Sequence, residues 1–254
     1  MAKLGTEPYK GVRDFYPEDM AIQNYIFDTW RKVAERLGYV EYSASLLEPT
    51  EIYTEKSGTE IINEQTFTFI DRGERSVTLR PEMTPTLARM IAARRRNLKF
   101  PLRWFSIPNL FRYERPQRGR KREHWQLNCD LLGLAGIEGD KEMVSLVYAV
   151  MKEFGAKDQD FEIRINNADI DNLKEIGPNL IFDHTLARGQ TYYTGIVFEI
   201  FDTNKENGRA LAGGGRYDNL LELFEVEPVP AIGFGMGDIT IRDFLETHKL
   251  GPYA

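Results

Sequence analysis

The stretch REHWQLNCDLLGLAG, residues 122–136, alternates polar and apolar side chains from His124 to Leu131. A period of two is typical of a β-strand that buries one face. The apolar face must pack on helices, so the polar face points away from them. Five side chains are predicted to share that polar face: Arg122, His124, Gln126, Asn128 and Asp130.

Hairpins and helices surround this strand without a strict βαβ rhythm. Residues 102–114 form the other arm of its hairpin, across the basic loop RPQRGRK, and residues 65–81 predict a second hairpin. Amphipathic spacing predicts a helix over 19–37. We therefore expect an α+β fold, with a large mainly antiparallel sheet flanked by helices, in a single domain over 1–254.

Two further helices have recognisable starts. Thr84 followed by Pro85 predicts a helix with Thr84 as its N-cap, which places Pro81-Glu82 at a strand-to-helix corner. Asp140 is a candidate cap for a helix over KEMVSLVYAVMKEF.

The composition is that of a globular protein with a core. The chain has 254 residues, a formal net charge of -6 and one cysteine, Cys129, which cannot form an internal disulfide. No apolar run approaches the roughly 20 residues that span a bilayer, and the first residues lack the apolar centre of a secretory signal. A cytoplasmic location without membrane contact is expected.

Positive charge is concentrated in the hairpin loop. Residues 112–126 hold six Lys and Arg within an acidic chain. Guanidinium groups present planar paired donors that fit phosphate oxygens, so the loop indicates a polyphosphate held over the polar strand face. Two other interpretations remain open from the pattern: a solvated sheet face, and a plain RNA-binding hairpin.

Residues 111–126, FRYERPQRGRKREHWQ, resemble motif 2 of the class II aminoacyl-tRNA synthetases in its histidyl-tRNA synthetase form. Further segments resemble the same family in the same order. They are KGVRDFYPEDM at 10–20, motif 1 near 38–50, LRPEMTP at 79–85, motif 2 at 109–133, the histidine signature at 186–199, and the motif 3 region at 213–247.

The resemblance implies that ATP, with Mg²⁺, activates L-histidine to histidyl-adenylate with release of pyrophosphate. The two catalytic arginines would be Arg112 and Arg188, on opposite sides of the α-phosphate. Glu114 would accept from the adenine amino group, and His124 occupies the position that stacks on adenine. The outer phosphates would meet Arg120 and Arg122. No magnesium ligand is assigned.

The histidine substrate would meet a second set of residues. By resemblance, Glu82 pairs with the α-ammonium, helped by Thr84 and Gln126. Asp130 and Tyr193, next to Tyr192, match the positions that contact the two imidazole nitrogens. The alternative interpretations are a helix-start carboxylate for Glu82 and a core aromatic for Tyr193.

The chain departs from the family pattern at single positions. His124 replaces the usual Phe, which adds a titratable group and predicts that ATP affinity varies near pH 6 to 7. Thr240 stands at the motif 3 arginine position, and Arg242 lies about 200° further round the helix. Ser45 replaces the motif 1 proline of the dimer interface, although a homodimer is still expected.

Larger departures concern tRNA. Few residues separate Asn167 from Asp183, where the family commonly inserts a helical domain, and we expect the anticodon-binding domain of the family to be missing. We therefore expect a minimal core that transfers histidine to tRNA(His) weakly or not at all. The alternative is a catalytically silent, histidine-binding paralogue like the ATP phosphoribosyltransferase regulatory subunit, against which the retained motif 2 residues argue.

Overall fold

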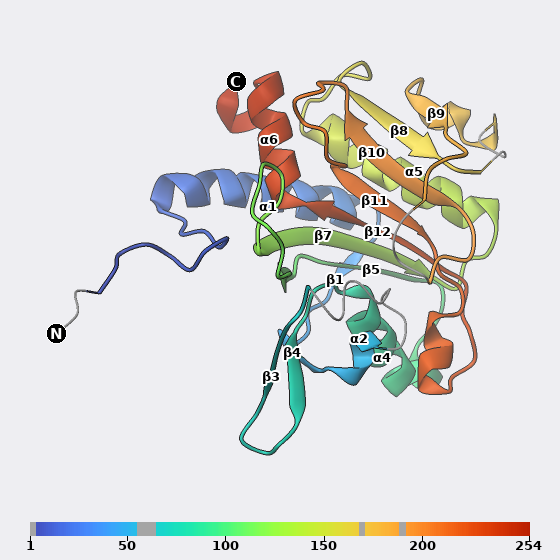
Figure 1. Cartoon of the computed structure of the whole chain (residues 1–254). Coiled ribbons are helices and arrows are strands. Elements are labelled where there is room, and N and C mark those ends of the chain that lie inside the picture. The colour runs from blue at the N-terminus through green and yellow to red at the C-terminus, as the bar shows by residue number, and fades with distance from the viewer. Residues whose placement is uncertain (1–3, 55–64, 168–170, 188–191) are drawn as a thin grey trace.

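A nine-stranded sheet forms the centre of the protein, as seen in a computed structural model that describes residues 4–54, 65–167, 171–187 and 192–254 (Figure 1). The strand order is β1-β5-β7-β12-β11-β10-β8-β9, and β6 also pairs with β7. Only β1 with β5 and β8 with β9 pair in parallel among these described strands. Their bounds are β1 Val40–Glu41, β5 Leu102–Ser106, β6 Asn109–Phe111, β7 Glu123–Leu132, β8 Phe161–Ile165, β9 Leu180–Phe182, β10 Val197–Asp202, β11 Ala212–Arg216 and β12 Ala231–Gly237.

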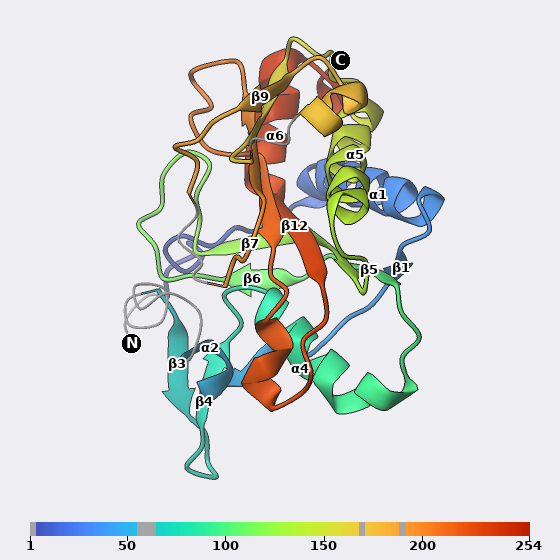
Figure 2. The same cartoon turned by 90° about the vertical axis from the view of Figure 1, so that its right-hand side faces the viewer.

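Three helices cover one face of this sheet: α1 (Pro17–Arg36), α5 (Ile137–Glu153) and α6 (Asp238–His248). Figure 2 shows α1 and α5 on one side of β7 and β12, with the basic loop before β7 on the other side. The large core lies between helices and sheet, and it includes Leu127, Cys129 and Leu131 of β7. The predicted α+β class and the predicted faces of residues 124–131 are confirmed.

A smaller layer lies at one edge of the molecule. It consists of a three-stranded sheet ordered β2-β4-β3 together with α2 and α4 (Figure 1). The bounds are β2 Leu47–Pro49, α2 Glu51–Thr54, β3 Phe67–Ile70, β4 Ser76–Leu79 and α4 Thr84–Arg94. Short 3₁₀ helices span Arg95–Asn97, Lys174–Ile176, Leu220–Phe224 and Gly251–Tyr253. The predicted second hairpin is therefore present as β3 and β4.

Both predicted helix caps are wrong. Helix α4 includes Thr84 and has Met83 at its N-cap, which leaves the Thr84 side chain available to face a cavity. Helix α5 begins at Ile137, so Asp140 lies inside its first turn. There the Asp140 carboxylate accepts from Arg216 of β11 at 2.5 and 3.0 Å, a partner that local sequence does not reveal.

Candidate active site

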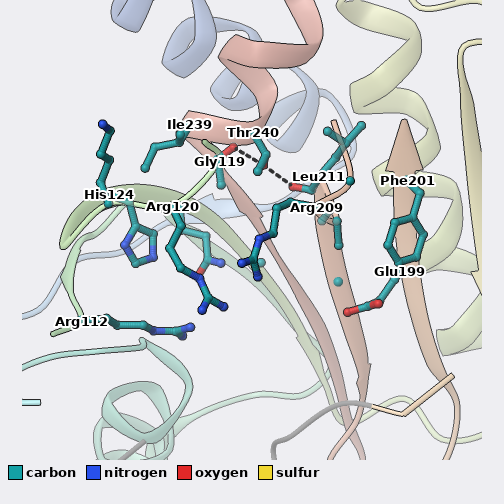
Figure 3. A pocket seen from close by; sticks show the side chains of 18 of the residues that line it. Arg112, Gly119, Arg120, His124, Glu199, Phe201, Arg209, Leu211, Ile239 and Thr240 are labelled. Carbon is teal, nitrogen blue, oxygen red and sulfur yellow. Dashed lines mark hydrogen bonds between the residues drawn. The ribbon is translucent and has the colours of Figure 1, made fainter. Parts of the chain in front are cut away.

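Two adjoining cavities lie on the polar face of β7. The basic cavity has a volume of about 410 Å³ and is bordered by β7, the loop before it, the segment between β10 and β11, and the start of α6 (Figure 3). The small cavity, about 70 Å³, lies between β7, β12 and the start of α4. Four residues line both cavities: Arg112, Gln126, Gly213 and Gly235.

The basic cavity contains most of the predicted nucleotide-binding residues. Arg112, Glu114, Arg120 and His124 all line it. The guanidinium of Arg112 donates through Nε to the Pro81 carbonyl at 2.9 Å, which fixes the side chain at the boundary between the cavities. The buried Glu114 carboxylate pairs with Arg120 at 2.5 Å. The predicted adenine acceptor and the predicted phosphate ligand therefore contact each other in this structure.

The pKa of His124 in the structure differs from the value near 6.5 that the sequence suggested. Burial, followed by the positive charges of Arg112, Arg13 and Arg120, lowers the pKa of the imidazole to about 3. The ring is therefore neutral throughout the range from pH 6 to 7. The predicted change of its charge near pH 6 to 7 is not supported, because burial of the ring, the largest cause of its low pKa, and the approach of Arg13 arise only in the folded chain.

Arg122 lies outside both cavities. Its guanidinium donates to the Glu114 carbonyl at 3.1 Å and to the Tyr9 hydroxyl at 2.9 Å, and it lies 3.9 Å from the ring centroid of Tyr113. These contacts fasten the N-terminal segment to the basic loop. The expectation that Arg122 reaches the outer phosphates is therefore not supported by its position.

The small cavity brings together every predicted histidine-binding residue. Glu82 and Thr84 enter from the start of α4, and their neighbours come from β7 and from the segment before β10. The Tyr192 hydroxyl donates to the Glu82 carboxylate at 3.0 Å, and both residues are buried. The full predicted set lining it is Glu82, Thr84, Gln126, Asp130, Tyr192 and Tyr193.

Asp130 lies at the floor of the small cavity. Its carboxylate accepts a hydrogen bond from the Tyr217 hydroxyl. Burial raises the pKa of the Asp130 carboxyl to about 7, and the Tyr217 hydrogen bond opposes this rise. A carboxyl that titrates near neutral pH can either accept from or donate to an imidazole nitrogen, which suits a ligand with one donor and one acceptor.

Glycines of β12 allow close approach to β7 beneath the cavities. A Cβ on Gly233 would lie 2.5 Å from the Asp130 Oδ1 atom, and a Cβ on Gly235 would lie 2.7 Å from the Gln126 side chain. No side chain larger than hydrogen fits at either position without displacing a residue of the site.

Arg188, the second predicted catalytic arginine, lies outside the described residues. Three residues of the cavities were missed from the sequence: Tyr217, Glu199 and Arg209. Tyr217 belongs to the quoted GGGRYD segment, and Glu199 ends the histidine signature, so both had a signal. Arg209 lies in the segment between β10 and β11, where no motif marks it.

Solved structures share this architecture. A structure titled as apo histidyl-tRNA synthetase from S. aureus has a TM-score of 0.80 and 26% identity, and covers 99% of this chain and 72% of that chain. One from Bacillus halodurans, titled as an ATP phosphoribosyltransferase regulatory subunit/histidyl-tRNA synthetase, has a TM-score of 0.81 at 23% identity, with coverages of 96% and 84%. The fold is the catalytic fold of the class II aminoacyl-tRNA synthetases.

Sequence comparison identifies the family. The family model described as histidyl-tRNA synthetase matches residues 11–172 and 168–238. A histidine--tRNA ligase of Leptospira biflexa is 38% identical over a gapped alignment of 333 positions, which covers 98% of this chain and 76% of the relative. The chain belongs to the histidyl-tRNA synthetase family. Within the described residues, no helix is both long and apolar enough to cross a membrane.

Proposed function

We propose that this protein activates L-histidine with ATP, giving histidyl-adenylate and pyrophosphate. The proposal rests on the wall that the basic cavity and the small cavity share. Arg112 and Gln126 border both, so a nucleotide in the basic cavity and an amino acid in the small one would meet beside the Arg112 guanidinium.

At that meeting point the histidine carboxylate attacks the α-phosphorus. A bond forms between a carboxylate oxygen and phosphorus, and the bond from phosphorus to the oxygen that bridges to the β-phosphate breaks. Arg112 stabilises the negative charge that grows on the phosphoryl oxygens, and preorganised charge of this kind is a large part of catalysis. Arg188 would act from the other side.

Nucleotide binding requires the Glu114–Arg120 pair to rearrange. Glu114 is buried, whereas Arg120 is partly exposed, so Arg120 is the partner free to move. When Arg120 turns to the outer phosphates, Glu114 becomes available to the adenine amino group. The neutral His124 ring offers the base a flat surface.

Histidine is held in the small cavity by groups of complementary charge. Glu82 binds the α-ammonium together with Thr84 and Gln126, while Asp130 and Tyr193 contact the imidazole nitrogens. An analogue without a ring nitrogen leaves one of these buried polar groups unpaired, which costs enough to reject it.

Magnesium would accompany the nucleotide. Mg²⁺ commonly takes one or two protein carboxylates together with substrate phosphates and waters. Glu199 lines the basic cavity and would hold the ion, since Glu114 is taken by the adenine amino group, although the described residues contain no group of three acidic, His or Cys ligands. The ion would neutralise part of the phosphate charge.

We further propose weak or absent transfer to tRNA(His), and a homodimer. The net charge of -6 disfavours binding of tRNA, because tRNA is a polyanion and its binding requires cationic side chains that neutralise many phosphates. The dimer proposal rests on the motif 1 region, 38–50, where Val40 and Leu47 are exposed. Filter-bound tRNA charging and analytical ultracentrifugation measure these two properties.

ATP–pyrophosphate exchange with each of the twenty amino acids tests the main proposal. We expect exchange with histidine alone, and its loss in Arg112→Ala and Arg188→Ala. Absence of histidine-dependent exchange in the wild type would refute catalysis. If histidine then still raised the melting temperature, the protein would be a histidine-binding paralogue of the regulatory kind.

A further inference from the structure

The start of α6 offers no cation to the basic cavity. Thr240, at the motif 3 arginine position, turns its hydroxyl toward the carbonyls of Leu211 and Gly237, at 3.4 and 3.3 Å. Arg242 points elsewhere, because its guanidinium binds Asp19 at 2.8 Å and the Tyr253 hydroxyl at 3.1 Å. Thus α6 leaves one corner of the cavity without positive charge.

Arg209 reaches the same corner from another element. It lies between β10 and β11 and lines the basic cavity together with Thr240 (Figure 3). A Cβ placed on Gly119 would lie 3.1 Å from the Arg209 Cγ atom and 3.5 Å from the Thr240 Cγ2 atom. Arg209 and Thr240 therefore border one point of the basic loop.

The backbone that carries Arg209 is anchored. Asn207, two residues earlier, is 7% exposed, and its side-chain amide donates to Asp202 at 2.7 Å and to Thr247 at 3.0 Å. The side-chain oxygen of Asn207 accepts a hydrogen bond from the Arg118 guanidinium of the basic loop at 3.0 Å. These bonds fix the segment to α6 and to the loop, so little ordering remains to be done when a ligand binds.

The Arg209 side chain differs from its neighbours in its contacts. Arg112, Arg118 and Arg120 each bind a protein oxygen. Across the described part of the chain, the half-buried Arg209 guanidinium makes no hydrogen bond or ion pair. A surface arginine of this kind would ordinarily extend into solvent, whereas this one points into the cavity in Figure 3.

We propose that Arg209 binds the phosphate chain of the nucleotide and supplies the charge that Thr240 does not. The inference rests on the proposed function, since it assumes ATP in the basic cavity. The forked guanidinium of Arg209 would bind two phosphoryl oxygens beside Arg120, since the Arg209 side chain lies against Gly119 of the basic loop. This chain thereby keeps a second arginine clamp at a different sequence position.

Calorimetric titration with Mg-ATP, and separately with adenosine, tests the proposal. Arg209→Ala should weaken Mg-ATP binding about 10- to 100-fold, the range expected for lost hydrogen bonds between charged groups, and leave adenosine binding unchanged. Arg209→Lys should fall between, because an ammonium keeps the charge without the fork. Lys205→Ala, an exposed cation on the same segment, is the matched control.

Two results would overturn the proposal: unchanged Mg-ATP affinity in Arg209→Ala, or an equal loss of adenosine affinity, which would place the side chain on the base. Melting temperatures equal to the wild type show that the variants are folded. In exchange assays, the KM for ATP should rise while the KM for histidine stays constant. Arg209-dependent ATP binding without histidine-dependent exchange would reject the proposed function and leave this inference standing.

Discussion

Replacing Asp130 by Asn should stabilise the folded protein above neutral pH while removing histidine binding. Burial raises the pKa of Asp130 to about 7 from an ordinary value of 3.8. Between these values the folded protein keeps a proton that the unfolded chain has released. Stability therefore falls as the pH rises through this range, because the unfolded state binds fewer protons than the folded state.

The size of the effect follows from the two pKa values. At about 1.36 kcal/mol for each pH unit, moving the carboxyl pKa from 3.8 to about 7 costs the folded state about 4 kcal/mol at pH 8. Asn has no proton to lose, and its side-chain oxygen still accepts from Tyr217. The free energy of unfolding of Asp130→Asn minus that of the wild type should therefore increase by about 3 kcal/mol between pH 5 and pH 8.

Urea denaturation at pH 5, 6, 7 and 8 measures this difference. Asp28→Asn, at an exposed aspartate, controls for the general effect of losing one carboxylate. Tyr217→Phe should extend the fall in stability to higher pH, since the Tyr217 hydrogen bond favours the ionised carboxyl. A difference between Asp130→Asn and wild type that stays constant from pH 5 to 8 would refute the reasoning.

Three further predictions concern the site and its support. Gly235→Ala should raise the KM for histidine at least about tenfold, because its Cβ would displace Gln126; an unchanged KM in exchange assays would contradict this. Arg216→Met should destabilise the protein by about 3 to 5 kcal/mol by leaving Asp140 buried and unpaired, and adding Asp140→Leu should restore part of the loss in urea titrations. The pH dependence of the KM for ATP near pH 6.5 should be the same in wild type and His124→Phe, since the pKa of His124 is about 3; an inflection that His124→Phe removes would disprove it.

Local patterns predicted the strand face well. Alternation from His124 to Asp130 depends only on the pleat of β7, so the cavity-facing positions followed from the sequence. The position of Arg122 does not support its expected role, because its partner Tyr9 is 113 residues away and meets it only in the folded chain. Asp140 failed as a cap for the same reason, since Arg216 lies 76 residues further along.

The resemblance supplied what alternation could not. It predicted that Glu82, Asp130 and Tyr193 belong to one site, and these residues from separate elements do line one cavity. Thr240 stands at a position that the family pattern marks, whereas Arg209 lies at a position that it does not mark. A family pattern records positions, whereas a cavity needs only charge at a place in space, and a residue outside the pattern can supply it.

The glycines beneath the two cavities also decide how this site can change. Because a methyl group on Gly233 or Gly235 would displace Asp130 or Gln126, these two positions offer no room for a side chain that reshapes the cavities. The other walls of the cavities are formed by β7, by the start of α4 and by the segments that carry Arg120 and Arg209. A library for laboratory evolution should therefore randomise those walls and leave the β12 glycines fixed.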